Sequence, residues 1–175
     1  MADPPTRITV VCSGNICRSP MAEAVLRRLL QVAGRPDVVV TSGGIGGWHV
    51  GEGADRRTVR VLAAHGYDAG AHRARQFTAG WFADHDLVLA ADRGHRHALR
   101  RLAPSASEAA KVRLLREFDP VAVRQGQDEV ADPYYGGSAD FEQCLREVEA
   151  ACRGVVRHVQ GRGALDEGER TGQPG

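Results

Sequence analysis

The sequence contains no long hydrophobic run, no secretory leader and almost no net charge. No apolar stretch approaches the ~18 residues that indicate a membrane-spanning helix, and residues 1–5 lack the basic and apolar segments of a signal peptide. Lysine and arginine total 23 against 22 acidic residues, interspersed along the chain, so no basic tail favours nucleic-acid binding. These absences predict a cytoplasmic protein without membrane or nucleic-acid partners. Export by a route that needs no signal peptide stays open.

Aromatic residues and metal-ligand patterns are also scarce. The chain has two tryptophans, three tyrosines and four phenylalanines, so an aromatic residue beside a candidate site is informative. His95 and His97 could contribute to a metal site, but the remaining ligands are not evident. Cys144 and Cys152 have a spacing that more often puts small apolar residues on one buried helix face. We therefore expect chemistry that uses neither a metal ion nor another cofactor.

The most informative segment is residues 11–20, with the sequence VCSGNICRSP. It follows apolar, β-branched residues from Ile8 onward, so Cys12 is expected at the carboxyl end of a buried strand. Gly14 and Asn15 tolerate unusual backbone angles, which lets the loop turn successive N–H groups inward. The segment therefore predicts an anion-binding loop that contains its own nucleophile.

A helix is expected to follow this loop, with Ser19 as its N-cap and Pro20 as its first residue. Its positive N-terminal end would favour an oxyanion, and Arg18 adds a planar fork that can hold two phosphoryl oxygens. Such surroundings lower a cysteine pKa from ~8.5 to roughly 3.5–7.5, so Cys12 is expected to be a thiolate that receives a hydrogen bond from Ser19. The alternative is a buried cysteine at a strand end beside a solvated arginine. The glycine-asparagine turn and serine-proline helix start favour catalysis.

Asp132 is the candidate proton donor. Cleavage of an aryl phosphate ester requires a proton for the departing oxygen, and a carboxylic acid can supply it and then act as base toward water. An Asp-Pro pair alone is a common turn. Here Pro133 stiffens the turn, and Tyr134 and Tyr135 follow it directly. We therefore predict that Asp132 is the general acid and base.

Apolar segments alternate with segments of helical periodicity along most of the chain. Strands are expected near residues 8–12, 38–42, 86–91 and 112–115, and helices near 20–33, 55–65, 93–102 and 138–159. This α/β alternation predicts a single domain over residues 1–160, with a central four-stranded parallel sheet, helices on both faces and the phosphate-binding loop at the end of the first strand. Residues 161–175 are predicted to be a disordered tail.

The segment CSGNICRSP resembles the signature loop of the low-molecular-weight protein tyrosine phosphatases of bacterial type. Further segments are similar to this family and follow in its order along the chain, at residues 41–51, 71–75, 87–92 and 132–135. The resemblance covers nearly the whole chain. One departure is Gly43, where the family usually has alanine; we expect it to loosen that loop without touching a catalytic role.

The resemblance implies metal-independent hydrolysis of protein phosphotyrosine through a cysteinyl-phosphate intermediate. Cys12 would be the nucleophile, Arg18 and the loop amides would bind the phosphoryl group, and Asp132 would be general acid and base. Residues expected to bind the phosphate or support the loop are Ser13, Gly14, Asn15, Ile16, Cys17, Ser19 and His72.

Three supporting roles follow from the same resemblance. His72 would hydrogen-bond the loop through Asn15 or Ser19, and Asp92 would steady Arg18. Cys17, unless it is merely a small loop residue, would form a disulfide with the nucleophile that protects it from irreversible oxidation.

The resemblance also implies a slot for the substrate ring. Trp48 and Tyr134 would flank the ring, and Tyr135 beside them would contribute to substrate binding or be phosphorylated itself. The alternative for Trp48 is packing against the edge of the core. The implied partners are tyrosine-phosphorylated proteins, with a cognate tyrosine kinase as a further candidate.

Two other functions remain open. Thioredoxin-coupled arsenate reductases resemble this fold, but they need a nearby pair of shuttle cysteines, and residues 76–92 contain none. A non-catalytic phosphoprotein-binding module is predicted to lack Cys12 or Asp132, and both are present. Among phosphatases, those specific for phosphoarginine resemble sequences with threonine where Ile16 stands, so a phosphotyrosine ester is favoured.

Overall fold

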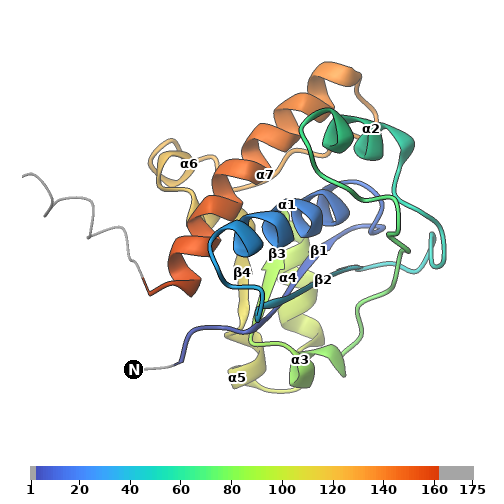
Figure 1. The fold of residues 1–175 in the computed structure, drawn as a ribbon. Coiled ribbons are helices and arrows are strands. Elements are labelled where there is room, and N and C mark those ends of the chain that lie inside the picture. The colour runs from blue at the N-terminus through green and yellow to red at the C-terminus, as the bar shows by residue number, and fades with distance from the viewer. Residues whose placement is uncertain (1–2, 162–175) are drawn as a thin grey trace, which may run out of the picture.

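Strand β1 (Arg7–Cys12) lies inside a four-stranded parallel sheet in the computed structural model, which describes residues 3–161 (Figure 1). The strand order is β2-β1-β3-β4, with β2 at Val39–Gly44, β3 at Leu87–Ala90 and β4 at Val112–Leu114. β1 pairs with β2 along its whole length and with β3 from Ile8 to Val11. Cys12 therefore ends a strand flanked on both sides, at the sheet edge where parallel α/β proteins bind ligands.

Helices cover both faces of this sheet. Helices α1 and α7 pack together on one face, α2 packs against α7, and α4 covers the other face (Figure 1). The bounds are α1 Arg18–Val32, α2 Arg56–Ala64, α3 Trp81–Asp84, α4 Arg93–Leu102, α5 Ala106–Ala109, the 3-10 helix η1 Leu115–Phe118, α6 Pro120–Arg124 and α7 Ser138–Val159.

Alternate residues of β1 contribute to two separate apolar cores. Ile8 and Val10 belong to the core beneath α1 and α7, together with Leu26 and Leu145 from those helices. Val11 belongs to the core on the α4 side. Because successive strand residues point to opposite faces and both faces are covered, β1 is buried continuously from Ile8 to Cys12 rather than at alternate residues. This packing fixes the position of Cys12 at the carboxyl end of β1.

All four predicted strands and all four predicted helices are present, and α4 and α7 have the predicted bounds. The predicted start of α1 is wrong. The helix begins at Arg18 with Cys17 as its N-cap, so Ser19 does not cap it and Pro20 is not its first residue. The reason is that the Ser19 hydroxyl lies 2.9 Å from the Cys12 sulfur instead of bonding to the helix N-terminus. The elements α3, α5, α6 and η1 were not predicted, because four or five residues are too few to show a helical period.

Gly43 does not loosen a loop, contrary to the expectation. It lies within β2, in register with Val11, and is buried. A Cβ at this position would lie 3.0 Å from the indole of Trp81, so the tryptophan fills the space that a side chain at residue 43 would take.

The tail predicted for residues 161–175 lies outside the described residues, apart from Gly161. None of the helices that the structure describes combines the length and the hydropathy needed to cross a bilayer.

Candidate active site

The loop between β1 and α1 presents a row of unpaired backbone donors. Within residues 3–161, none of the backbone N–H groups of residues 13–19 donates a hydrogen bond to another protein group. No side chain caps α1 at Cys17 either. Because backbone N–H groups in folded proteins are otherwise almost always paired, and helix N-termini attract anions, this stretch is suited to bind an oxyanion.

Asn15 holds the loop in its curled form. It is the one described residue other than glycine with a positive φ, 59°, and it is fully buried. Its side-chain Nδ2 donates to Ser19 Oγ at 2.8 Å and to Ser42 Oγ at 2.9 Å, and its Oδ1 accepts from the backbone N–H of Arg75 at 2.9 Å. Asparagine tolerates left-handed backbone geometry better than most residues. The three hydrogen bonds then select this conformation.

We expect Asn15→Ala to destabilise the protein by about 2–4 kcal/mol, because buried partners lose their hydrogen bonds and alanine is strained at positive φ. Asn15→Gly should be less destabilising by about 0.5–1 kcal/mol, because glycine removes the same hydrogen bonds without that backbone strain. Urea unfolding of both variants and the native chain measures the difference. Equal stability of the two variants would show that the left-handed geometry contributes nothing.

Ser19 lies between Asn15 and Cys12 in a directed chain of hydrogen bonds. Its oxygen accepts from Asn15 Nδ2, so its own proton is available to donate. The Cys12 sulfur, 2.9 Å away, is a closer acceptor than the Gly43 carbonyl at 3.4 Å. The Cys12 side chain is itself buried at the base of the loop. A donated hydrogen bond at this position stabilises negative charge on the sulfur.

Arg18 is held by two acceptors on one side of its guanidinium. Nη1 donates to Asp92 Oδ2 at 3.0 Å and to the Val130 carbonyl at 3.1 Å, with the side chain only 5% exposed. Burial disfavours ionisation of Asp92, but the hydrogen bond from the His95 backbone and the His95 and Arg18 charges lower the pKa of its carboxyl. The second nitrogen, Nη2, lies 3.5 Å from Asp132 Oδ2. Protein acceptors therefore hold the Nη1 side of the Arg18 guanidinium in place, and the Nη2 side is available to bind an oxyanion.

A cavity of about 330 Å³ brings most of the predicted site residues together. Its lining consists of Cys12, Ser13, Gly14, Ile16, Cys17, Arg18, Trp48, His49, Asp132, Tyr134 and Tyr135. The predicted supports that do not line it, Asn15, Ser19 and His72, hydrogen-bond to the loop instead.

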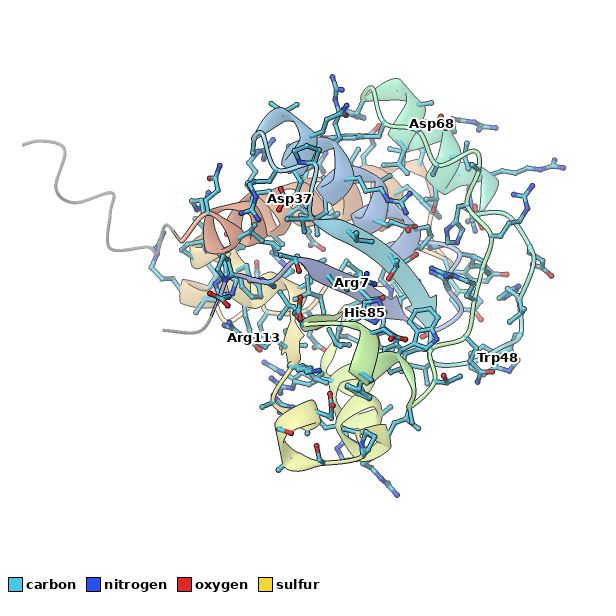
Figure 2. All side chains as sticks on the ribbon, turned by 60° about the horizontal axis from the view of Figure 1, so that its bottom comes forward. Arg7, Asp37, Trp48, Asp68, His85 and Arg113 are labelled. Atoms are coloured by element: carbon cyan, nitrogen blue, oxygen red, sulfur yellow. The ribbon has the colours of Figure 1, made fainter. Side chains whose placement is uncertain are left out.

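Asp132 and three aromatic residues form the open side of this cavity. The Asp132 side chain is 44% exposed, and its Oδ1 accepts from the backbone N–H of Tyr134 at 3.1 Å. Trp48 is 72% exposed and lies at the outer edge of the molecule (Figure 2), so it does not pack against the core. Tyr134 is partly exposed and Tyr135 almost fully exposed, with their rings edge to face at 4.9 Å. These rings are available to contact a ligand.

His72 and Glu23 support the loop from behind. His72 Nε2 donates to the Asn15 carbonyl at 2.8 Å, and its Nδ1 lies 3.4 Å from Glu23 Oε2. Ser42 accepts from Asn15 and donates to the same Glu23 oxygen at 3.0 Å. Burial disfavours ionisation of Glu23, but the His72 hydrogen bond, the Arg27 charge and the Ser42 hydrogen bond together lower the pKa of its carboxyl. The network connects a buried carboxylate to the strained turn.

Cys17 is buried, although it contributes to the lining of the cavity. Its side chain belongs to the main apolar core, and burial raises the pKa of its thiol to about 12. All four cysteines are free in the structure. The disulfide between Cys12 and Cys17 stays a prediction.

The two candidate metal ligands on α4 have different surroundings. His95 is buried against Ser13, whereas His97 is exposed. Among residues 3–161, no group of three or more histidine, cysteine, aspartate or glutamate side chains could hold a metal ion.

The sequence matches the family described as "Low molecular weight phosphotyrosine protein phosphatase" over residues 7–164. The chain belongs to this family. The "Low molecular weight protein-tyrosine-phosphatase" of Streptomyces coelicolor is 56% identical over 163 residues, which cover 90% of this chain and 98% of that protein. The "Low molecular weight protein-tyrosine phosphatase A" of Mycobacterium tuberculosis is 48% identical, covering 93% and 96%.

Solved structures of low-molecular-weight phosphatases have the same fold. A protein tyrosine phosphatase from Entamoeba histolytica, with Hepes in its active site, gives a TM-score of 0.82 at 29% identity and covers 94% of this chain and 99% of that one. The tyrosine phosphatase Wzb from Escherichia coli K30, in complex with sulphate, gives 0.76 at 30% identity, covering 91% and 99%.

Three residues that support the phosphatase loop were missed by sequence reasoning. Glu23 and Ser42 belong to the network behind Asn15, and His95 contacts Ser13. Glu23 left a usable signal, because a carboxylate among the apolar positions of α1 must find a partner when buried. For Ser42 and His95 the sequence gives no such signal beyond the residue type, since their partners are distant in sequence.

Proposed function

We propose that this protein hydrolyses phosphotyrosine in proteins, without a metal ion, through a phosphoryl group bound covalently to Cys12. The observation that favours this function most is the set of unpaired N–H groups of residues 13–19, with the Cys12 sulfur at its base and Arg18 beside it. Donors in this arrangement bind the oxygens of a phosphoryl group and place its phosphorus next to a nucleophile. Membership of the phosphatase family supports the same reaction.

In the first step the Cys12 thiolate attacks phosphorus and the bond to the tyrosine oxygen breaks. The loop amides and Arg18 neutralise charge on the three equatorial oxygens. Asp132, which lies 3.5 Å from Arg18 Nη2 at the open side of the cavity, gives its proton to the departing phenolate oxygen. The products are the dephosphorylated tyrosine side chain of the substrate protein and a cysteinyl phosphate on Cys12.

In the second step water attacks the cysteinyl phosphate. Asp132, now a carboxylate, accepts a proton from the water, and the sulfur-phosphorus bond breaks to release inorganic phosphate. The Ser19 hydroxyl, 2.9 Å from the sulfur, stabilises the departing thiolate. Both steps therefore use the same two side chains: Asp132 changes from acid to base, and Cys12 changes from nucleophile to leaving group.

The aromatic rim is proposed to select the substrate. Trp48 and Tyr134 flank the phenyl ring of phosphotyrosine, and Tyr135 contacts the polypeptide around it, since all three line the cavity and are exposed. Tyrosine-phosphorylated proteins are the proposed substrates, and a cognate tyrosine kinase is a proposed partner in signalling. We further propose a cytoplasmic location, because a reducing compartment preserves the four free cysteines.

The two remaining cysteines disfavour arsenate reduction. Cys144 and Cys152 are buried in α7, within the main core, and burial raises the pKa of both thiols. A shuttle cysteine must reach the nucleophile and react as a thiolate. The raised pKa of both thiols disfavours the thiolate that this step requires.

Phosphate release from three classes of peptide in EDTA tests the proposal. We expect turnover of a phosphotyrosine peptide to exceed that of matched phosphoserine and phosphoarginine peptides by at least about 10²-fold, because only an aryl ring fills the slot between Trp48 and Tyr134. Loss of activity in EDTA would contradict the metal-independent mechanism. Equal turnover of phosphoarginine would contradict the substrate class.

A further inference from the structure

Ser13, the residue after the nucleophile, contacts a histidine from the opposite side of the sheet. Its hydroxyl oxygen lies 2.8 Å from Nε2 of His95, in the first turn of α4. Ser13 is exposed and lines the cavity, whereas His95 is buried and does not. The serine hydroxyl therefore connects the buried imidazole to the cavity.

These two residues complete a closed ring of polar contacts around Arg18. Asp92 Oδ2 accepts from Arg18 Nη1 at 3.0 Å, and Asp92 Oδ1 accepts from the His95 backbone N–H at 2.9 Å. The same oxygen lies 3.2 Å from His95 Nδ1. Ser13 closes the ring, because its oxygen accepts from Arg18 Nη2 at 3.5 Å. Both nitrogens of the guanidinium fork are thus in contact with the ring.

The carboxylate of Asp92 decides which nitrogen of neutral His95 holds the proton. The Nδ1 contact is too oblique for a well-formed hydrogen bond, yet the charge 3.2 Å away still favours a proton on Nδ1. Nε2 is then an acceptor, and the Ser13 hydroxyl must donate to it. In this state the Ser13 proton points away from the cavity and its lone pairs face Arg18.

We propose that His95 is a positioning residue that sets the direction of the Ser13 hydroxyl, and that its protonation turns this hydroxyl into an additional donor for the bound phosphoryl group. The inference rests on the proposed function, because it assumes that an oxyanion occupies the loop. A protonated Nε2 must donate to Ser13 Oγ, so the hydroxyl proton must then turn elsewhere. The cavity that Ser13 lines with Cys12 and Arg18 offers the oxyanion as acceptor.

The charges around His95 give the direction of the pH dependence. Burial lowers the pKa of His95; Asp92 opposes this shift, Arg18 adds to it, and Asp132 and Glu129 oppose it. The imidazole of the free protein is therefore neutral at pH 7 and becomes protonated below its ordinary range. A bound dianion favours the protonated form, so by linkage anion affinity rises as the pH falls through the His95 pKa.

Sulfate is the probe for this coupling, because it stays a dianion from pH 5 to 8 and is not hydrolysed. Nuclear magnetic resonance follows the His95 ring through a pH titration with and without sulfate, the signal being assigned by its absence in His95→Gln. Calorimetry gives the sulfate Kd at each pH. Ser13→Ala removes the hydroxyl, Ser13→Thr restores it, and neither variant replaces Cys12 or Asp132.

We expect sulfate to raise the His95 pKa more in the native chain and in Ser13→Thr than in Ser13→Ala. Between pH 7.5 and 5 the sulfate Kd should tighten by about threefold to tenfold more in the native chain than in Ser13→Ala or His95→Gln, as expected for one added hydrogen bond. Identical pH dependence in the native chain and Ser13→Ala would overturn the inference even if sulfate binds well. Failure of the native chain to bind sulfate at any pH would instead contradict the proposed function.

Discussion

Replacing Cys12 with serine is expected to lower kcat/KM for a phosphotyrosine peptide by at least about 10⁴-fold. A serine hydroxyl is not ionised at neutral pH, and no group in the loop is placed to remove its proton. The side chain in hydrogen-bond contact with residue 12, Ser19, donates toward it rather than accepting from it. Steady-state phosphate release measures the loss of activity.

Binding should survive this substitution. The unpaired N–H groups of residues 13–19 and the fork of Arg18 do not depend on the sulfur. We expect Cys12→Ser to retain sulfate affinity within about tenfold of the native value, since the loop donors provide most of the anion's contacts. A mass increase of one phosphoryl group, found in acid-quenched native protein and absent from the variant, would place the intermediate on Cys12.

Cys144→Ser is the matched control, because it makes the same chemical change at another buried cysteine. Cys144 lies in α7 and does not line the cavity. Its replacement should reduce stability, since a hydroxyl is buried among apolar side chains, but leave kcat/KM nearly unchanged at a temperature where the variant is folded. Substantial turnover by Cys12→Ser would contradict covalent catalysis by Cys12.

Most of the fold was predictable because its elements are long and have chemical boundaries. α2 and α4 begin at aspartates whose side chains accept from the helix backbone, Asp55 from the N–H of Arg57 and Asp92 from that of His95. The predicted start of α1 was wrong because the side chain that was expected to cap the helix makes a different contact. Ser19 is an N-cap residue type, but its hydroxyl contacts the Cys12 sulfur, and the helix N-terminus is left uncapped.

The proximity of Cys12 and Arg18 was predictable for a different reason. Cys12 and Arg18 belong to one short segment, so their proximity follows from local sequence, whereas the groups that hold them do not. The His72 contact with Asn15 spans 57 residues and the Ser13 contact with His95 spans 82. Only the family resemblance pointed to the first, and the second became visible only once the sheet had brought α4 beside the loop.

Replacing Asp132 with asparagine is expected to lower kcat/KM for phosphotyrosine by about 10²–10⁴-fold, because the departing phenolate then receives no proton. The loss should depend on the leaving group. In a substrate with a strongly acidic phenol, such as a nitrophenyl phosphate, the phenol can leave as its anion without being protonated. For this substrate the variant should form the cysteinyl phosphate at a nearly native rate.

Hydrolysis of the intermediate also needs Asp132, as base toward water. The variant should therefore release a burst of nitrophenolate equal to the enzyme concentration and then turn over much more slowly than the native chain. Asp84→Asn is the matched control, since Asp84 is an exposed carboxylate on α3 outside the cavity. If Asp132→Asn slows the nitrophenyl ester and phosphotyrosine equally, without a burst, Asp132 does not transfer the proton in either step. The 3.5 Å contact between Asp132 Oδ2 and Arg18 Nη2 would then be its only role, as an electrostatic partner of the phosphate-binding group.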